Sequence, residues 1–283
     1  MLRLHNGNGG IFIPDGTEPE AALRRTTDLC IAAHQDDVEI MAYGPIAQCY
    51  EKDDRWFAAV VVTDGAGSPR AGRYASLSDL EMQKVRVREQ VDAARLGKYA
   101  AVLQLGYPSA AVKAAGDGLC ASELRDIVRL TRPDTVYTHN LADKHDTHVG
   151  VTLRVLEALR PLPPEERPLK LYALEVWRGL DWLPDGSKAV FDTSPYPELA
   201  ADLLRVFASQ CAGGKRYDKA APGRRLANAA FFSPHHVDSM DSCSYGLDIT
   251  PLMIDETLRP GAFIGRQIEA LRREITGRIG RME

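Results

Sequence analysis

The sequence predicts an α/β fold in which a mostly parallel, doubly wound sheet carries helices on both faces. Three observations support this class. Strand-like and helix-like segments alternate four times before Leu159, which is typical of a parallel sheet. The first of these segments, over residues 29–33, is short and continuously apolar, as expected for a strand buried on both faces. Polar residues directly follow two of the strand-like segments, at the end where open α/β sheets bind ligands.

The four predicted strands cover residues 29–33, 56–63, 101–105 and 135–138. A helix follows each strand. The helix after the second strand begins at Ser78, because Ser78 and Glu81 have the spacing of a capping box. The helix after the third strand ends before Pro133, since the residue preceding a proline avoids the helical conformation. We therefore expect a Rossmann-like sheet with a C-terminal extension.

We expect residues 1–283 to form one domain, with a core over about 28–232, an irregular segment over 233–255 and a C-terminal helix over about 261–281. This last helix carries one apolar stripe, which indicates core packing or a contact between subunits in a homo-oligomer. Within the irregular segment, His235 and His236 favour two interpretations equally. The segment is either a lid over the site or a solvated loop or subunit contact.

The bulk properties are those of a soluble enzyme in the cytoplasm. A net charge of −4 gives no basic surface for nucleic acid or an acidic membrane. No apolar segment approaches the roughly 20 residues of a membrane-spanning helix. The N-terminus lacks the apolar core of a signal peptide. The five cysteines are an odd number without a C-x-x-C pair, which argues against a disulfide scaffold.

A first polar cluster directly follows the strand over residues 29–33. It places His34, Asp36, Asp37 and Glu39 close together. Two carboxylates and an imidazole at this spacing need protons or a cation between them, and His34 and Asp37 are ligand types that suit zinc. The alternative is that the two aspartates only cap the following helix.

A second cluster follows the strand over residues 135–138. His145 and His148 lie near the predicted start of a helix, with Asp146 or Thr147 as its N-cap. Two clusters of histidine and aspartate at the same edge of one sheet are hard to explain as independent helix caps. The two clusters together therefore favour a metal site.

The string A-H-x-D-D-x-E with a later H-x-x-H resembles the PIG-L/LmbE-like zinc-dependent N-deacetylases over about residues 29–159. These enzymes remove acetyl groups from N-acetylglucosamine-type amides. The resemblance implies that His34, Asp37 and His148 bind Zn²⁺, with Fe²⁺ or another divalent metal as the alternative. One departure is that Gln35 stands where the family usually has proline.

The remaining role assignments concern the reaction and the substrate. Asp36 cannot easily point the same way as Asp37, so it is free to act as the general base. His145, beside the metal but outside the ligand set, is expected to stabilise the oxyanion. The resemblance matches Arg86 to a substrate-contacting arginine in an R-x-x-E helix, although an ordinary solvated helix face explains this spacing equally well. Ser109 replaces an aspartate that often holds substrate in the family.

A glycine-rich loop follows the strand over residues 56–63 and is expected to form a pocket wall. Its Arg70 and Tyr74 favour substrate contact over a disordered connection. The predicted substrate is a small N-acyl amino sugar or a glycoconjugate.

We therefore expect a zinc-dependent hydrolase that removes an acetyl or other acyl group from an N-acetylglucosamine-like amide. A third departure from the family is Phe207, which stands where the family has the histidine of an H-x-S-Q motif. One alternative is a metal-binding protein that recognises sugars or has a regulatory role without turnover, which the departures at Gln35, Ser109 and Phe207 favour. A closer alternative is a zinc hydrolase of a non-sugar amide or an ester. The sequence lacks the serine-hydrolase elbow, the P-loop and a dinucleotide-binding glycine motif after a strand.

Overall fold

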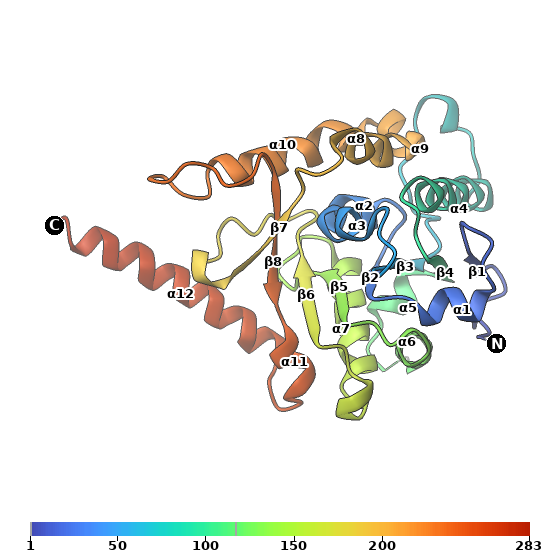
Figure 1. Cartoon of the computed structure of the whole chain (residues 1–283), viewed down its shortest axis with the longest axis horizontal. Coiled ribbons are helices and arrows are strands. Elements are labelled where there is room, and N and C mark those ends of the chain that lie inside the picture. The colour runs from blue at the N-terminus through green and yellow to red at the C-terminus, as the bar shows by residue number, and fades with distance from the viewer. Residues whose placement is uncertain (1, 117) are drawn as a thin grey trace.

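The computed structural model describes residues 2–116 and 118–283. In this part of the chain, eight strands form one sheet in the order β1-β4-β3-β2-β5-β6-β8-β7 (Figure 1). Their bounds are β1 Gly10–Phe12, β2 Asp28–Ala32, β3 Phe57–Thr63, β4 Ala101–Tyr107, β5 Thr135–His139, β6 Lys170–Leu174, β7 Lys188–Asp192 and β8 Cys243–Asp248.

The middle of the sheet is parallel, as predicted, and its strand order reverses at β2. The chain runs from β2 outward to β3 and β4 on one side, and then returns to β5 and β6 on the other side. Antiparallel strands close both edges: β1 pairs with β4, and β8 lies between β6 and β7. The carboxyl ends of β2 and β5 are therefore neighbours at the switch point, where doubly wound sheets bind ligands.

Helices cover both faces of the sheet, as expected for strands that are buried on both sides (Figure 1). The helices are α1 Pro19–Arg24, α2 Asp37–Met41, α3 Tyr43–Cys49, α4 Asp79–Leu96, α5 Ser109–Lys113, α6 Gly118–Thr131, α7 Asp146–Leu159, α8 Pro197–Arg205, α9 Ala208–Gln210, α10 Tyr217–Ala230, α11 Thr250–Ile254 and α12 Pro260–Gly280. The sheet separates two apolar clusters. One lies under α6 and α7, and the other lies under α2, α3 and α8.

The expectation of an irregular segment over residues 233–255 is wrong in its second half. Strand β8 and helix α11 lie there, and β8 pairs with both β6 and β7. The sequence of β8 is C-S-Y-G-L-D, which has no continuous apolar segment to mark it as a strand. Its burial comes from tertiary packing, since Gly246 faces the side chains of Leu174 and Phe191.

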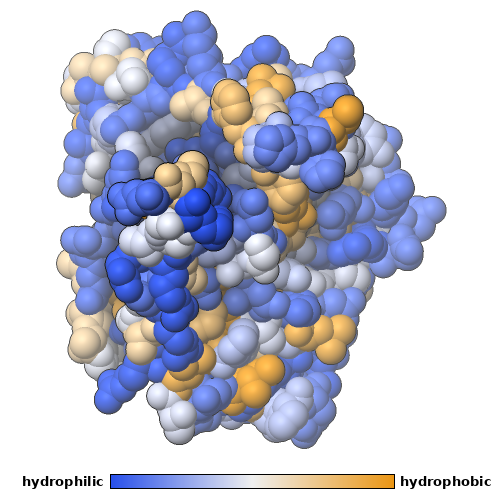
Figure 2. Space-filling model, turned by 90° about the vertical axis from the view of Figure 1, so that its left-hand side faces the viewer, coloured by the Kyte–Doolittle hydropathy of each residue, from blue (hydrophilic) through white to orange (hydrophobic). Residues whose placement is uncertain are grey.

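The predicted C-terminal helix is α12, which extends away from the body of the molecule (Figure 1). Only Phe263 at its start is buried, whereas Ile268 and Ile275 are 54% and 45% exposed. The core-packing interpretation of the stripe is therefore wrong beyond the first turns, and the oligomer contact stays a prediction. Figure 2 faces this end of the molecule and shows a mostly hydrophilic surface with separate hydrophobic patches. None of the helices in the described residues combines the length and the apolarity needed to cross a membrane.

Candidate metal centre and active site

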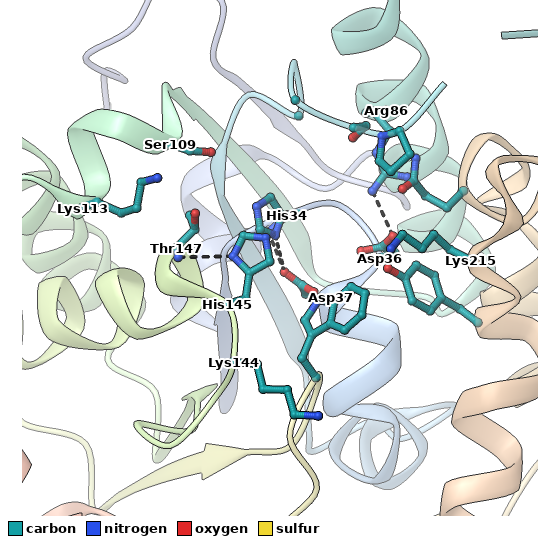
Figure 3. A pocket seen from close by; sticks show the side chains of 17 residues that line it. His34, Asp36, Asp37, Arg86, Ser109, Lys113, Lys144, His145, Thr147 and Lys215 are labelled. Carbon is teal, nitrogen blue, oxygen red and sulfur yellow. Dashed lines mark hydrogen bonds and ion pairs between the residues drawn. The ribbon is translucent and has the colours of Figure 1, made fainter. Parts of the chain in front are cut away.

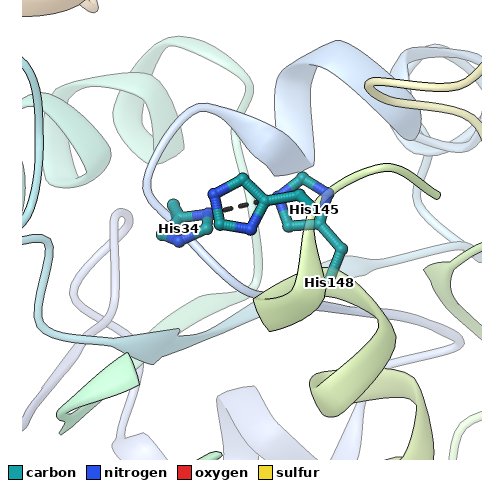
Figure 4. Close-up of side chains that lie close together, drawn as sticks. All are labelled: His34, His145 and His148. Atoms are coloured by element: carbon teal, nitrogen blue, oxygen red, sulfur yellow. Dashed lines mark hydrogen bonds between the residues drawn. The ribbon is translucent and has the colours of Figure 1, made fainter. Parts of the chain in front are cut away.

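The two polar clusters meet at the switch point of the sheet. His34 follows β2, and Asp37 opens α2. His139 ends β5, while His145 and His148 belong to the N-cap and first turn of α7. The imidazole rings of the predicted site lie together although they come from opposite sides of the strand reversal (Figure 4). The register of β2 beside β5 brings them to the same edge.

The three predicted metal ligands form a small triangle of donor atoms. His34 Nδ1 lies 3.0 Å from Asp37 Oδ2. His148 Nε2 lies 3.2 Å from Asp37 Oδ2 and 3.2 Å from His34 Nδ1. Ligands about 2.1 Å from a zinc ion, at angles between about 90° and 109°, are about 3.0–3.4 Å apart. The separations of these atoms therefore fit a two-histidine, one-carboxylate site that faces the pocket.

Without a metal, protons hold this triangle together. Burial alone would raise the pKa of Asp37, but the His148 and His34 rings lower it well below its ordinary value. Burial alone would lower the pKa of His148, but Asp37 and Asp143 raise it to about 9. The metal-free site therefore keeps a proton on His148 at neutral pH, and a divalent cation would replace that proton.

Asp143 orients His148 from the side opposite to Asp37, and sequence reasoning missed it. Its Oδ2 lies 3.5 Å from His148 Nδ1 and accepts a hydrogen bond from the backbone N–H of Trp177. Its Oδ1 accepts from the backbone N–H of His145. A carboxylate behind a ligating histidine fixes the tautomer and the ring orientation. The residue has no distinguishing spacing in the H-N-L-A-D-K-H-D-T-H stretch, so only the fold reveals this contact.

His139 is a second residue that the sequence interpretation left without a role. Its fully buried ring stacks on the His148 ring with centroids 3.9 Å apart. Its Nε2 is 3.7 Å from Asp37 Oδ2, but it accepts a 2.8 Å hydrogen bond from the backbone N–H of Ala33. That bond occupies the lone pair a metal would need. Burial and the neighbouring His148 lower the pKa of His139, so it packs as a neutral ring.

His145 lies at the centre of the pocket and is half-buried. Its Nδ1 accepts from the backbone N–H of Thr147 at 3.3 Å, which places the proton of the neutral ring on Nε2. Burial and His148 lower its pKa, so the neutral form is present at pH 7. In this tautomer the free side of the ring is a hydrogen-bond donor. This is the form that the predicted oxyanion role requires.

Asp36 lies beside the metal triangle but faces a different partner. It is the N-cap residue of α2 and has an unusual φ of 91°. Figure 3 shows Asp36 on the side of Arg86, and Asp37 on the side of His34. Asp36 Oδ2 is 3.1 Å from Arg86 Nη2. Burial raises the pKa of Asp36 to about 6, although Arg86 opposes this shift. A carboxylate with a pKa near the working pH suits a general base.

Arg86 lines the pocket, yet it is only 1% exposed, so the solvated-face interpretation is wrong. Its guanidinium contacts the backbone carbonyl of Gln35, and its Nη1 is 3.1 Å from Glu89 Oε2. Glu89 in turn accepts from the Ser209 hydroxyl. The R-x-x-E spacing thus builds a buried ion pair behind Asp36.

Two other predicted positions have structural surroundings that the sequence did not indicate. The Gln35 side chain points into the sheet edge, where its Nε2 donates to the Thr63 carbonyl and to Gln104 Oε1. Glu39 points away from the triangle, and its Oε1 accepts from Gln90 Nε2 and from the Tyr99 hydroxyl. Burial raises the pKa of Glu39 to about 8. Both residues support the loop and helix that carry Asp36 and Asp37.

The pocket above these groups has a volume of about 530 Å³ (Figure 3). Ser109 lines it, together with His34, Asp36, Asp37 and His145. Arg70 and Tyr74 do not belong to its lining. Arg70 pairs with Asp79, and the Tyr74 ring is buried. The glycine-rich loop reaches the pocket through Gly65, Gly67, Ser68 and Pro69 instead.

The predicted lid histidines also lie elsewhere. His235 and His236 are exposed, and neither lines the metal pocket. His236 lines a separate cavity of about 380 Å³ with Phe232 and Val237. The lid interpretation therefore finds no support in the contacts of this segment.

Residues 29–159 match the family model described as "PIG-L: GlcNAc-PI de-N-acetylase". No curated protein sequence is significantly similar to the chain.

The fold is similar to that of several solved structures. N,N'-diacetylchitobiose deacetylase from Pyrococcus horikoshii, in complex with its inhibitor MPG, has 18% identity and a TM-score of 0.63, and the match covers 79% of this chain and 84% of that chain. GalB, the 4-carboxy-2-hydroxymuconate hydratase of Pseudomonas putida KT2440, has 17% identity and a TM-score of 0.61, with 79% and 96% covered. A zinc-inhibited form of teicoplanin deacetylase Orf2 has 17% identity and a TM-score of 0.56, with 79% and 97% covered.

At these identities the solved structures establish the fold alone, which extends over most of the chain. The family match covers the segment that holds both halves of the metal triangle, from His34 to His148. In this segment, the chain is similar to the PIG-L family of deacetylases.

Proposed function

We propose that this protein is a metal-dependent hydrolase that removes the acetyl group from an N-acetylglucosamine-like amide, with zinc as the metal. One observation carries the proposal. The triangle of His34, Asp37 and His148 lies beside Asp36, a buried carboxyl whose pKa of about 6 suits a general base. The match of residues 29–159 to the family model of a de-N-acetylase supports the reaction class.

The residues have separate tasks in this proposal. His34, Asp37 and His148 would hold the ion, which supplies Lewis-acid activation of water and of the amide carbonyl. Asp36 takes a proton from the attacking water at a carboxylate oxygen and returns it to the nitrogen of the leaving amine. His145 donates from Nε2 to the oxygen that becomes negative during attack. Arg86 keeps the Asp36 carboxylate in place through its 3.1 Å contact.

A second candidate is the addition of water to a substrate other than an amide. The similarity in fold to the GalB hydratase motivates it, since a metal site and a general base serve both reactions. A binding protein without turnover is less consistent with the site, because binding alone gives no use for the ionisable Asp36 beside the ligands.

The test is a substrate panel with the zinc-loaded protein. N-acetylglucosamine and its glycosides and phosphates would be incubated with it, and both free amine and acetate would be quantified. We expect equal amounts of both products, and their loss in Asp36→Asn. A protein with one zinc per chain that releases amine from no member of the panel would contradict the proposal.

A further inference from the structure

Three lysines surround the metal pocket in a chain whose net charge is −4. They are Lys113 at the end of α5, Lys144 just before α7, and Lys215 after α9. Among residues 2–116 and 118–283, none of the three forms an ion pair with a carboxylate. The pocket aspartates have other partners, since Asp36 faces Arg86 and Asp37 faces the histidines. The lysines therefore leave uncompensated positive charge at the pocket.

Lys113 is the best positioned of the three, because its backbone is fixed against α7. Helix α5 approaches α7 at Gly150, where a Cβ atom would lie 3.2 Å from the carbonyl oxygen of Val112. Arg154, a buried residue of α7, donates from Nη1 to the backbone carbonyl of Ala114 at 2.8 Å. These contacts hold the end of α5 beside the pocket, so the Lys113 side chain extends from a fixed backbone position.

Two hydroxyl groups lie on the same side of the pocket as Lys113. Figure 3 shows Ser109 and Thr147 with Lys113 on one side of the His34 and His145 rings, whereas Asp36, Arg86 and Lys215 lie on the other side. Ser109 and Lys113 are four residues apart on α5, so they share a helix face. Hydroxyl donors beside an ammonium form a site that suits an anion with several acceptor oxygens.

We infer that Ser109, Lys113 and Thr147 form a subsite for an anionic group of the substrate, a phosphate or a carboxylate, on the side of the metal centre opposite to Asp36. This inference rests on the proposed function, which identifies the occupant of the pocket as an N-acyl amino sugar. Lys144 and Lys215 add a positive field around the pocket, which attracts such a substrate. The substrate is therefore a negatively charged N-acyl amino sugar rather than a neutral one.

The test compares charged and neutral ligands of the same sugar by calorimetry. The probes are N-acetylglucosamine, its 1-phosphate, its 6-phosphate and N-acetylmuramic acid, so phosphate and carboxylate are distinguished. We expect a charged probe to bind at least about tenfold more tightly than the neutral sugar, the scale of one hydrogen bond to a charged group. Lys113→Gln should remove most of that preference, and Lys113→Arg should keep it. Ser109→Ala should reduce it less than Lys113→Gln does.

The matched control is Lys52→Gln, which removes the same charge from an exposed lysine outside the pocket lining. It should leave the preference intact. Equal binding of all four probes, or a preference that survives Lys113→Gln, would overturn the inference. Amine release is measured separately. If the preference depends on Lys113 but no probe is hydrolysed, the subsite stands and the proposed reaction fails.

Discussion

Replacing Asp36 with asparagine separates the cost of its burial from its use in catalysis. The side chain is 5% exposed, and burial raises its pKa from 3.8 to about 6. At about 1.4 kcal/mol per pKa unit, the ionised carboxylate in the metal-free protein lowers the free energy of unfolding by up to about 3 kcal/mol. Asparagine has nearly the same shape and no charge. Arg86 would still have its 3.1 Å contact with Glu89, so the variant leaves no isolated cation.

The sign of the effect depends on pH. A carboxyl whose pKa is raised by folding does not lower the free energy of unfolding while it is protonated in both the folded and the unfolded protein. The full decrease in the free energy of unfolding applies above the pKa of the folded protein. With pKa values of 3.8 and about 6, the expected stabilisation by Asp36→Asn grows from below about 1 kcal/mol at pH 4 to about 3 kcal/mol at pH 8. Urea unfolding in the presence of a chelator, at both pH values, measures this difference.

The same variant should lose activity while it keeps the metal. We expect a decrease in kcat of roughly a hundredfold or more, which is the usual contribution of a general base. The zinc content should stay at one per chain, whereas Asp37→Asn should lower it. An Asp36→Asn protein that keeps its activity, or one that is destabilised equally at pH 4 and pH 8, would refute the reasoning.

Three further predictions concern the metal centre and α12. His148→Ala should abolish zinc binding, and Asp143→Asn should weaken it by about 10- to 100-fold; unchanged affinity in both would refute the ligand assignment. Because the pKa of His148 is raised to about 9 and a ligating ring must be neutral, zinc binding at pH 7 should release about one proton, and affinity should rise with pH up to about 9. Calorimetry in two buffers of different ionisation enthalpy detects this proton, and its absence contradicts the charge assignment. Removal of residues 272–283, all exposed, should change the free energy of unfolding by less than about 1 kcal/mol; a larger loss in chemical denaturation would show that they contribute to the fold.

The sequence allowed prediction of those parts of the fold that local signals determine. Strands β2 and β3 contain continuous apolar segments, and helix α4 begins at a recognisable cap, Ser78 with Glu81. The meeting of the two clusters of histidine and aspartate also followed from topology, because the carboxyl ends of parallel strands share one edge. The choice of His34, Asp37 and His148 among their residues followed from the family resemblance.

Other features were not predictable because they depend on tertiary contacts. Strand β8 is buried by its neighbours rather than by its own apolar pattern. Arg86 was expected to contact substrate or water, and its burial follows from its position under Asp36 and Phe207. Asp143 and His139 are ordinary residues of a polar stretch until the fold places them against His148. The contacts of Arg86 join distant parts of the chain, whereas those of Asp143 and His139 depend on how the segment between β5 and α7 folds back on His148.

The separation of the ligands along the chain gives the metal a mechanical consequence. His34 and His148 are 114 residues apart, and they lie on opposite sides of the strand reversal. A bound ion would act as a removable cross-link between the half of the sheet that contains β3 and β4 and the half that contains β5 and β6. In the chain-entropy description of cross-links, closing a loop of this length stabilises a fold by several kcal/mol, on the order of 4–5. Loss of the ion would therefore first weaken the packing where β2 pairs with β5, at the centre of the sheet. New sites of proteolysis should then appear in the segments that follow these two strands.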